Sequence, residues 1–159
     1  MNIEFGGILG ILQKHKVRFF ITGGISAVLQ GAPITTFDLD VVHERSQENV
    51  QKLKNALDEM DAYYRTRRDI KIRPQLDDLS GKGHHLLLTT FGPLDVLGTI
   101  GNGRDFSDFI DETEIVTLEK YSVNVQTLRS LIQTKEEVGM EKDSAMLPIL
   151  RQTLRERKS

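Results

Sequence analysis

The chain has 159 residues, of which 38% are hydrophobic and 28% are charged, a composition typical of a folded domain rather than a disordered chain. Lys and Arg number 21 against 23 Asp and Glu, for a formal charge of −2. A generally basic nucleic-acid-binding surface is therefore excluded, and any such binding must come from a local patch. The absence of cysteine excludes disulfides, thiolate zinc sites and cysteine nucleophiles.

No membrane partner is expected. The longest apolar run near the start, Ile8 to Leu12, is interrupted by Gly10 and is far too short for a membrane span. Glu4 stands where a signal peptide would carry Lys or Arg, so we expect no export. These features predict a cytoplasmic protein.

Helices and strands are predicted to alternate in the first part of the chain. Apolar residues at helical spacing predict helices, and β-branched or aromatic runs predict strands. In chain order these patterns predict a helix over 3–15, a strand over 17–21, a short helix over 26–30, a strand over 37–42 and a helix over 47–60. Gly23 and Gly24 close the first strand, and Gly31 with Pro33 ends the short helix.

The rest of the chain is predicted to add antiparallel strands and then two helices. The patterns predict strands over 85–90 and 94–100 joined at Gly92-Pro93, short strands over 114–118 and 122–125, and helices near 127–138 and 142–157. This order predicts an α+β fold, with helices packed on a small mixed β-sheet and a C-terminal helical pair. Because no Pro- or Gly-rich linker interrupts it, we expect one domain over 1–159, with a core over about 1–126 and the C-terminal helices over about 127–159.

The pair Gly23-Gly24, between a predicted strand and the helix that contains Ser26, is a candidate phosphate-binding turn. Glycine lets the backbone approach a ligand closely, and the free N–H groups of a helix start favour anions. Two glycines also end strands for steric reasons alone. The pattern by itself leaves both interpretations open.

Three aspartates within apolar strands are candidate metal ligands. Asp38 and Asp40 are two residues apart, so they lie on one face of the predicted strand. Buried carboxylates need cations, and their hard oxygen atoms suit Mg²⁺. Asp95 is a third carboxylate in an apolar strand, and three such groups can hold two metal ions for phosphoryl transfer. The alternatives are an exposed edge strand for the pair and a local turn contact for Asp95.

At these residues the chain resembles the nucleotidyltransferase superfamily, which includes DNA polymerase beta and many minimal bacterial enzymes. The family pattern is a strand, Gly-Gly or Gly-Ser, a helix, an Asp-apolar-Asp strand and a later single Asp. The resemblance implies two Mg²⁺ ions, with Mn²⁺ as a substitute, bound by Asp38, Asp40 and Asp95, of which Asp95 helps to activate the acceptor. It also implies that Gly23, Gly24 and Ser26 hold the triphosphate.

The resemblance extends to the C-terminal region, where Leu128, Leu131, Lys135 and Gly139 follow a pattern similar to that of bacterial members related to abortive-infection-type toxins. Two positions depart from this pattern. Ile34 stands where relatives often carry Arg, and Met140 follows Gly139 where Arg is common. Losing either cation could weaken phosphate binding or change the substrate.

Lys135 and Asp143 can also be interpreted from helical spacing. Lys135 lies seven residues after Leu128 on the apolar stripe of its predicted helix. Asp143 lies on the inward face at the start of the next helix. The two side chains could form a structural ion pair, or Lys135 could bind a phosphate as the resemblance suggests.

The basic stretch from Arg65 to Arg73 has two interpretations. Its cations are Arg65, Arg67, Arg68, Lys71 and Arg73, and Tyr63 and Tyr64 precede them. Such a stretch could hold an RNA or nucleotide acceptor. The interpretation that composition favours is a solvated strand with Ile70 and Ile72 alternating inward. His84 and His85 are predicted to be surface residues of a loop.

Together these features predict a metal-dependent nucleotidyltransferase that uses a nucleoside triphosphate such as ATP and releases pyrophosphate. The acceptor could be RNA, a small molecule or a protein. One alternative is a tRNA-modifying toxin with an antitoxin partner. The other is a relative that binds a nucleotide or a partner without turnover, which the missing Arg at position 34 would favour.

Overall fold

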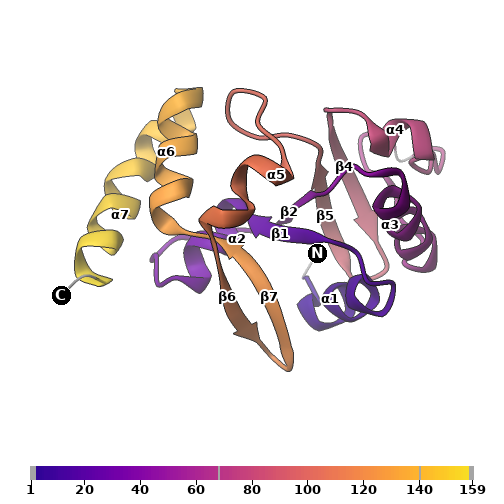
Figure 1. The fold of residues 1–159 in the computed structure, drawn as a ribbon, viewed down its shortest axis with the longest axis horizontal. Coiled ribbons are helices and arrows are strands. Elements are labelled where there is room, and N and C mark those ends of the chain that lie inside the picture. The colour runs from indigo at the N-terminus through magenta and orange to yellow at the C-terminus, as the bar shows by residue number, and fades with distance from the viewer. Residues whose placement is uncertain (1–2, 68, 140, 158–159) are drawn as a thin grey trace.

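A computed structural model of the chain describes residues 3–67, 69–139 and 141–157, apart from the side chains of 141–144. The described residues have an α+β fold in which helices flank one mixed sheet, as predicted (Figure 1). The strands are β1 (Phe19–Thr22), β2 (Leu39–His43), β3 (Tyr63–Tyr64), β4 (His84–Thr89), β5 (Gly92–Leu97), β6 (Thr113–Leu118) and β7 (Tyr121–Gln126). The helices are α1 (Phe5–Lys14), α2 (Gly23–Leu29), α3 (Gln47–Glu59), α4 (Leu76–Ser80), α5 (Phe106–Phe109), the 3-10 turn η1 (Ile110–Glu112), α6 (Leu128–Val138) and α7 (Glu141–Arg157).

The seven strands are arranged in the order β3-β4-β5-β2-β1-β7-β6. Neighbouring strands are antiparallel except for two pairs: β2 lies parallel to β5, and β1 lies parallel to β7. Both parallel pairs join strands that are far apart in the sequence. As a result β1, β2 and β5 occupy the interior of the sheet, where both edges of each strand are paired.

Three apolar clusters surround the sheet. The main core lies between one face of the sheet and the helices α1 and α3. A second cluster joins α2 to α6 and α7, with Ala27 and Leu150 fully buried in it. The third cluster lies on the other face of the sheet, where Phe20 of β1 packs against Phe106 and Phe109 of α5. Figure 1 shows α6 and α7 side by side at one end of the molecule. No described helix is both long and apolar enough to cross a membrane.

Side-chain caps fix the starts of α3 and α6, and a glycine ends α6. The hydroxyl of Ser46 accepts a hydrogen bond from the Asn49 N–H at the start of α3, and Thr127 accepts one from Ser130 at the start of α6. Gly139 ends α6 in the left-handed conformation, at φ 65°. Lys135 is thereby placed in the last turn of α6.

Several predicted elements differ from the structure. The short helix predicted over 26–30 begins earlier, at Gly23, and Asp38 precedes β2 rather than lying within it. The strand predicted to follow the turn at Gly92-Pro93 in fact begins at Gly92. The elements β3, α4 and α5 were not predicted, because they are only two to five residues long and carry too little periodicity.

Candidate functional site

The register of the central strands brings two of the three predicted aspartates together. Asp40 of β2 lies directly beside Asp95 of β5, and Thr22 of β1 lies on the other side of Asp40. The strand residues that flank both aspartates point into the main core. Because successive side chains of a strand alternate, the aspartates lie on the opposite face. Asp38 reaches the same area from just before β2, and its side chain is 41% exposed.

Asp40 is electrostatically unusual. Its pKa is raised from 3.8 to about 8, chiefly because burial disfavours the charged carboxylate. A hydrogen bond with the Asp95 carboxyl and the charges of Asp95 and Asp38 raise it further, while the charge of Lys135 lowers it. At neutral pH and without a bound cation, the raised pKa favours the protonated form of Asp40, whose carboxyl is hydrogen-bonded to that of Asp95.

Arg65 supplies a cation to this group, which sequence reasoning did not foresee. Its Nη1 donates a hydrogen bond to Oδ1 of Asp95 at 2.6 Å, and its Nη2 lies 3.6 Å from Oδ2 of Asp38. Among the described residues, no cluster of three or more acidic or histidine side chains is arranged to hold a metal ion as it stands. Two of the three aspartates instead face the guanidinium group. Their strand patterns could not show this contact, because it depends on the pairing of β3 with β4.

Both residues of the glycine pair are closely packed, Gly23 against Asp40 and Gly24 against Thr36. Gly23 opens α2 at φ 71°, a conformation that glycine adopts readily. A Cβ atom at this position would lie 2.1 Å from Oδ2 of Asp40, and one at Gly24 would lie 2.6 Å from Oγ1 of Thr36. The first glycine thus lets the backbone between β1 and α2 lie against the carboxylate.

A pocket of about 330 Å³ opens beside Asp40 and Gly23. Polar side chains line part of it, and Lys135 is among them. Apolar side chains of β5, the segment after it and α6 line the rest. The pocket residues that were not predicted are Thr22, His84, Leu97, Thr99, Ile100, Gly101, Leu131, Thr134 and Val138. Of these, Thr22 and Thr134 directly precede the predicted residues Gly23 and Lys135. This adjacency is the one feature of the sequence that could have indicated them.

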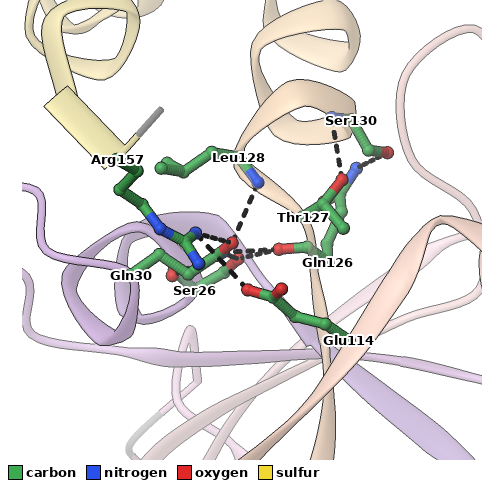
Figure 2. A network of polar contacts seen from close by, with 8 residues as sticks. All are labelled: Ser26, Gln30, Glu114, Gln126, Thr127, Leu128, Ser130 and Arg157. Carbon is green, nitrogen blue, oxygen red and sulfur yellow. Dashed lines mark hydrogen bonds and ion pairs between the residues drawn. The ribbon is translucent and has the colours of Figure 1, made fainter. Parts of the chain in front are cut away.

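Ser26 does not line this pocket. Its side chain is fully buried, and its hydroxyl donates a hydrogen bond to the carbonyl oxygen of Gln126 at 2.7 Å. The amide nitrogen of Gln30 donates to the same carbonyl at 2.7 Å. Figure 2 shows this network between α2, the end of β7 and the start of α6. The side chain of Ser26 thus joins α2 to the end of β7, and its contact with a triphosphate stays a prediction.

The same network reaches the pocket through the side chain of Gln126, which is fully buried. Its Oε1 accepts a hydrogen bond from the Thr22 hydroxyl at 2.5 Å. Its Nε2 donates to the hydroxyls of Ser130 at 2.8 Å and Thr134 at 3.0 Å. Because Thr134 precedes Lys135, Gln126 ties α6 to the end of β1. Sequence reasoning missed this residue, since a glutamine at the end of a strand carries no distinctive pattern.

The structure bears on the two interpretations of Lys135. Lys135 lines the pocket, and its charge acts on Asp40. The side chain of Asp143, the other half of the predicted ion pair, lies outside the part of the chain that the structure describes. Met140, one of the two departures from the family pattern, lies outside it as well.

The basic stretch is neither an inward-facing strand nor a row of unpaired cations. Ile70 and Ile72 are 50% and 41% exposed, so the predicted inward alternation is wrong. Beyond Arg65, each described cation of the stretch has an acidic partner: Arg67 pairs with Asp69, and Lys71 and Arg73 both pair with Asp61. Arg68 lies outside the described residues.

The two histidines lie in β4 rather than in a loop. His84 lines the pocket, and its Nε2 lies 2.8 Å from the carbonyl oxygen of Thr99. His85 is buried, and the hydroxyl of Tyr64 lies 2.9 Å from its Nδ1. Burial lowers the pKa of His85, so the ring is neutral at physiological pH.

Two solved structures resemble this chain over most of its length. One is a presumptive nucleotidyltransferase (TM1012) from Thermotoga maritima, with a TM-score of 0.59 and 18% identity over 96% of this chain and 91% of that chain. The other is the lincosamide antibiotic adenylyltransferase LnuA with lincomycin bound, with a TM-score of 0.64 and 15% identity over 95% and 98%. The chain thus has the nucleotidyltransferase fold, as its sequence resemblance predicted. No protein-family profile and no curated protein matches it.

Proposed function

We propose that this chain, which has the nucleotidyltransferase fold, is a metal-dependent nucleotidyltransferase. It would move the nucleoside monophosphate of a nucleoside triphosphate such as ATP to an acceptor. The new bond joins the acceptor oxygen to the α-phosphorus, the α–β anhydride bond breaks, and pyrophosphate leaves. The observation that carries this proposal is that Asp40, which is paired with Asp95 of the neighbouring strand, lines a pocket together with Gly23 and Lys135.

The acidic residues fit a divalent cation. Asp40 and Asp95 offer only oxygen donors, and their mutual repulsion, with that of Asp38, helps to raise the pKa of Asp40 to about 8. A hard cation such as Mg²⁺ or Mn²⁺ would relieve this repulsion in place of the proton on Asp40. Asp38, Asp40 and Asp95 are the residues that would hold it, and two ions are expected. Bound metal would supply charge neutralisation on the transferred phosphoryl group.

The protein's own residues would position the reactants. The apolar wall formed by Leu97, Ile100 and Leu131 suits a nucleobase, and Lys135 on the polar side suits a phosphate. Asp95 would accept the proton of the acceptor hydroxyl. Such a site acts through orientation and electrostatic stabilisation rather than through covalent chemistry on the protein.

Ion pairing within the basic stretch supports a small-molecule acceptor over RNA. Arg65 faces the aspartates, and the other described cations of the stretch face Asp69 or Asp61. Paired cations make a poor phosphate-binding surface. We therefore propose that the acceptor is a hydroxyl group of a small molecule. The lincosamide antibiotic on which LnuA acts is also a small molecule.

The test is pyrophosphate release with each of the four nucleoside triphosphates, Mg²⁺, and separate panels of hydroxylated small molecules, total RNA and protein. We expect release with at least one small molecule and none from Asp40→Asn. Transfer to tRNA would favour the toxin alternative. Tight Mg-NTP binding without release on any panel would favour a non-catalytic relative, and undetectable Mg-NTP binding by calorimetry would contradict the proposal.

A further inference from the structure

Arg65 is a half-buried cation that contacts two of the three aspartates, Asp38 and Asp95. Its side chain is 19% exposed, against 12% for that of Asp95. Besides its 2.6 Å hydrogen bond to Asp95, Nη1 donates to the carbonyl oxygen of Leu87 at 2.9 Å. The guanidinium group is planar and rigid. Its orientation is therefore determined by the two contacts of Nη1 together with the approach of Nη2 to Asp38.

The backbone holds Arg65 in a fixed relation to Asp95. Tyr64 pairs with Leu87 across β3 and β4, and the backbone N–H of Arg65 donates to the carbonyl oxygen of Leu86 at 3.1 Å. Leu86 is in turn the β4 partner of Asp95. The arginine therefore follows a strand two positions from that of Asp95, and its side chain crosses the intervening β4 to reach the carboxylate.

The neighbouring pair of Arg67 with Asp69 shows what an ordinary ion pair in this segment is like. Its side chains are 57% and 67% exposed, and its members are two residues apart in sequence. Exposed pairs of this kind contribute little to stability, whereas removing one partner of a buried pair leaves the other charge uncompensated. Arg65 thus has a different role from the cations that follow it.

We propose that Arg65 is a positioning residue for Asp95, an inference that rests on the proposed function. The hydrogen bond to Oδ1 restrains rotation of the carboxylate and so fixes the oxygen that would accept the acceptor's proton. A carboxylate that rotates freely would spend less time in the reactive orientation. Arg65 also balances the charges of Asp38 and Asp95, both of which face its guanidinium group.

The first test needs no activity. Urea unfolding is measured for Arg65→Met, Asp95→Asn and the double variant of the full chain, with Arg67→Met, Asp69→Asn and their double variant as the matched control cycle. We expect Arg65→Met to lower the urea midpoint, and to lower it by clearly less in the Asp95→Asn background. The control cycle should be additive. Additive midpoints in the Arg65–Asp95 cycle would overturn the inference.

The second test separates positioning from folding. In single-turnover pyrophosphate release at saturating Mg-NTP and acceptor, Arg65→Met should be roughly tenfold slower or more, with the dissociation constant of Mg-NTP changed less than about threefold. Arg65→Lys should regain part of the rate, and Arg67→Met should match the wild type. An unchanged rate in Arg65→Met, or a parallel loss of NTP affinity, would contradict the role.

The outcomes of these two tests distinguish a failure of the inference about Arg65 from a failure of the proposed function. If the wild-type protein releases no pyrophosphate with any triphosphate and acceptor, the proposed function fails, and the unfolding cycle still decides whether Arg65 is coupled to Asp95. If the enzyme is active but Arg65→Met behaves like Arg67→Met, the proposed function stands and the inference about Arg65 falls.

Discussion

Asp40 is the residue whose chemistry depends most on its surroundings. The same aspartate on an open strand would titrate near 3.8, but burial and two neighbouring carboxylates raise its pKa to about 8. The sequence indicates an acidic residue in an apolar strand. It does not indicate that Asp95 lies directly opposite, since that depends on the parallel pairing of β2 and β5.

The raised pKa of Asp40 predicts how stability depends on pH. The folded chain keeps this proton where the unfolded chain has lost it, so the contribution of Asp40 is fully present below about pH 4 and is lost as pH rises to about 8. The loss is at most about 1.4 kcal/mol for each pH unit in this window. Asp40→Asn should flatten this part of the curve. Urea unfolding from pH 4 to pH 9 without metal measures it, and parallel curves for wild type and variant would contradict it.

Gly23 makes a second prediction at the scale of one residue. Gly23→Ala places a Cβ in a left-handed conformation and 2.1 Å from Oδ2 of Asp40. We expect a loss of about 1–3 kcal/mol in the free energy of unfolding, together with weakened Mg-NTP binding because Asp40 must move. Gly83→Ala is the control, because a Cβ there meets no atom within 4 Å. Equal urea midpoints for the two variants would show that Gly23 is not under this constraint.

At the scale of elements, a helix or strand could be predicted from the sequence when it was long and when capping residues marked its ends. The helix predicted over 47–60 was confirmed as α3, and Ser46 caps its start. The helix predicted near 127–138 was confirmed as α6, between Thr127 and Gly139. In contrast, β3 spans only two residues and owes its existence to pairing with β4. Because Arg65 follows β3, its contact with Asp95 could not be predicted either.

The hydrogen bonds of Gln126 predict a link between the end of β1 and the position of α6. Gln126→Met removes the buried amide group that is hydrogen-bonded to the hydroxyls of Thr22, Ser130 and Thr134. We expect the free energy of unfolding to fall by about 1–3 kcal/mol and Mg-NTP affinity to fall with it, because Lys135 follows Thr134. Gln133→Met, at an exposed position of the same helix, is the control. An unchanged NTP dissociation constant in Gln126→Met would show that α6 keeps its place without this residue.

At the scale of the whole molecule, the expectation of one domain over 1–159 stays a prediction, and the second apolar cluster suggests how to test it. Ala27 and Ala32, from α2 and just after it, are buried against Leu131 and Leu150 of the C-terminal helices. A chain ending at residue 126 would expose this surface and leave Thr22 beside a frayed strand end. We expect the shortened chain to show no cooperative urea transition by circular dichroism. A cooperative transition close to that of the full chain would mean that the C-terminal helices are a separate unit.

The place of β1 in the sheet also has a consequence for the newly made chain. The contact between Thr22 and Gln126 spans 104 positions of the sequence, and among the described strands β7 is the one that covers that edge of β1. At about 5–20 residues per second, a ribosome needs roughly 5–20 s to make the intervening segment. During that interval the unpaired edge of β1 can add a strand from another nascent chain. The strand arrangement that encloses the aspartates therefore leaves this edge of β1 open to pairing with other chains until β7 has been made.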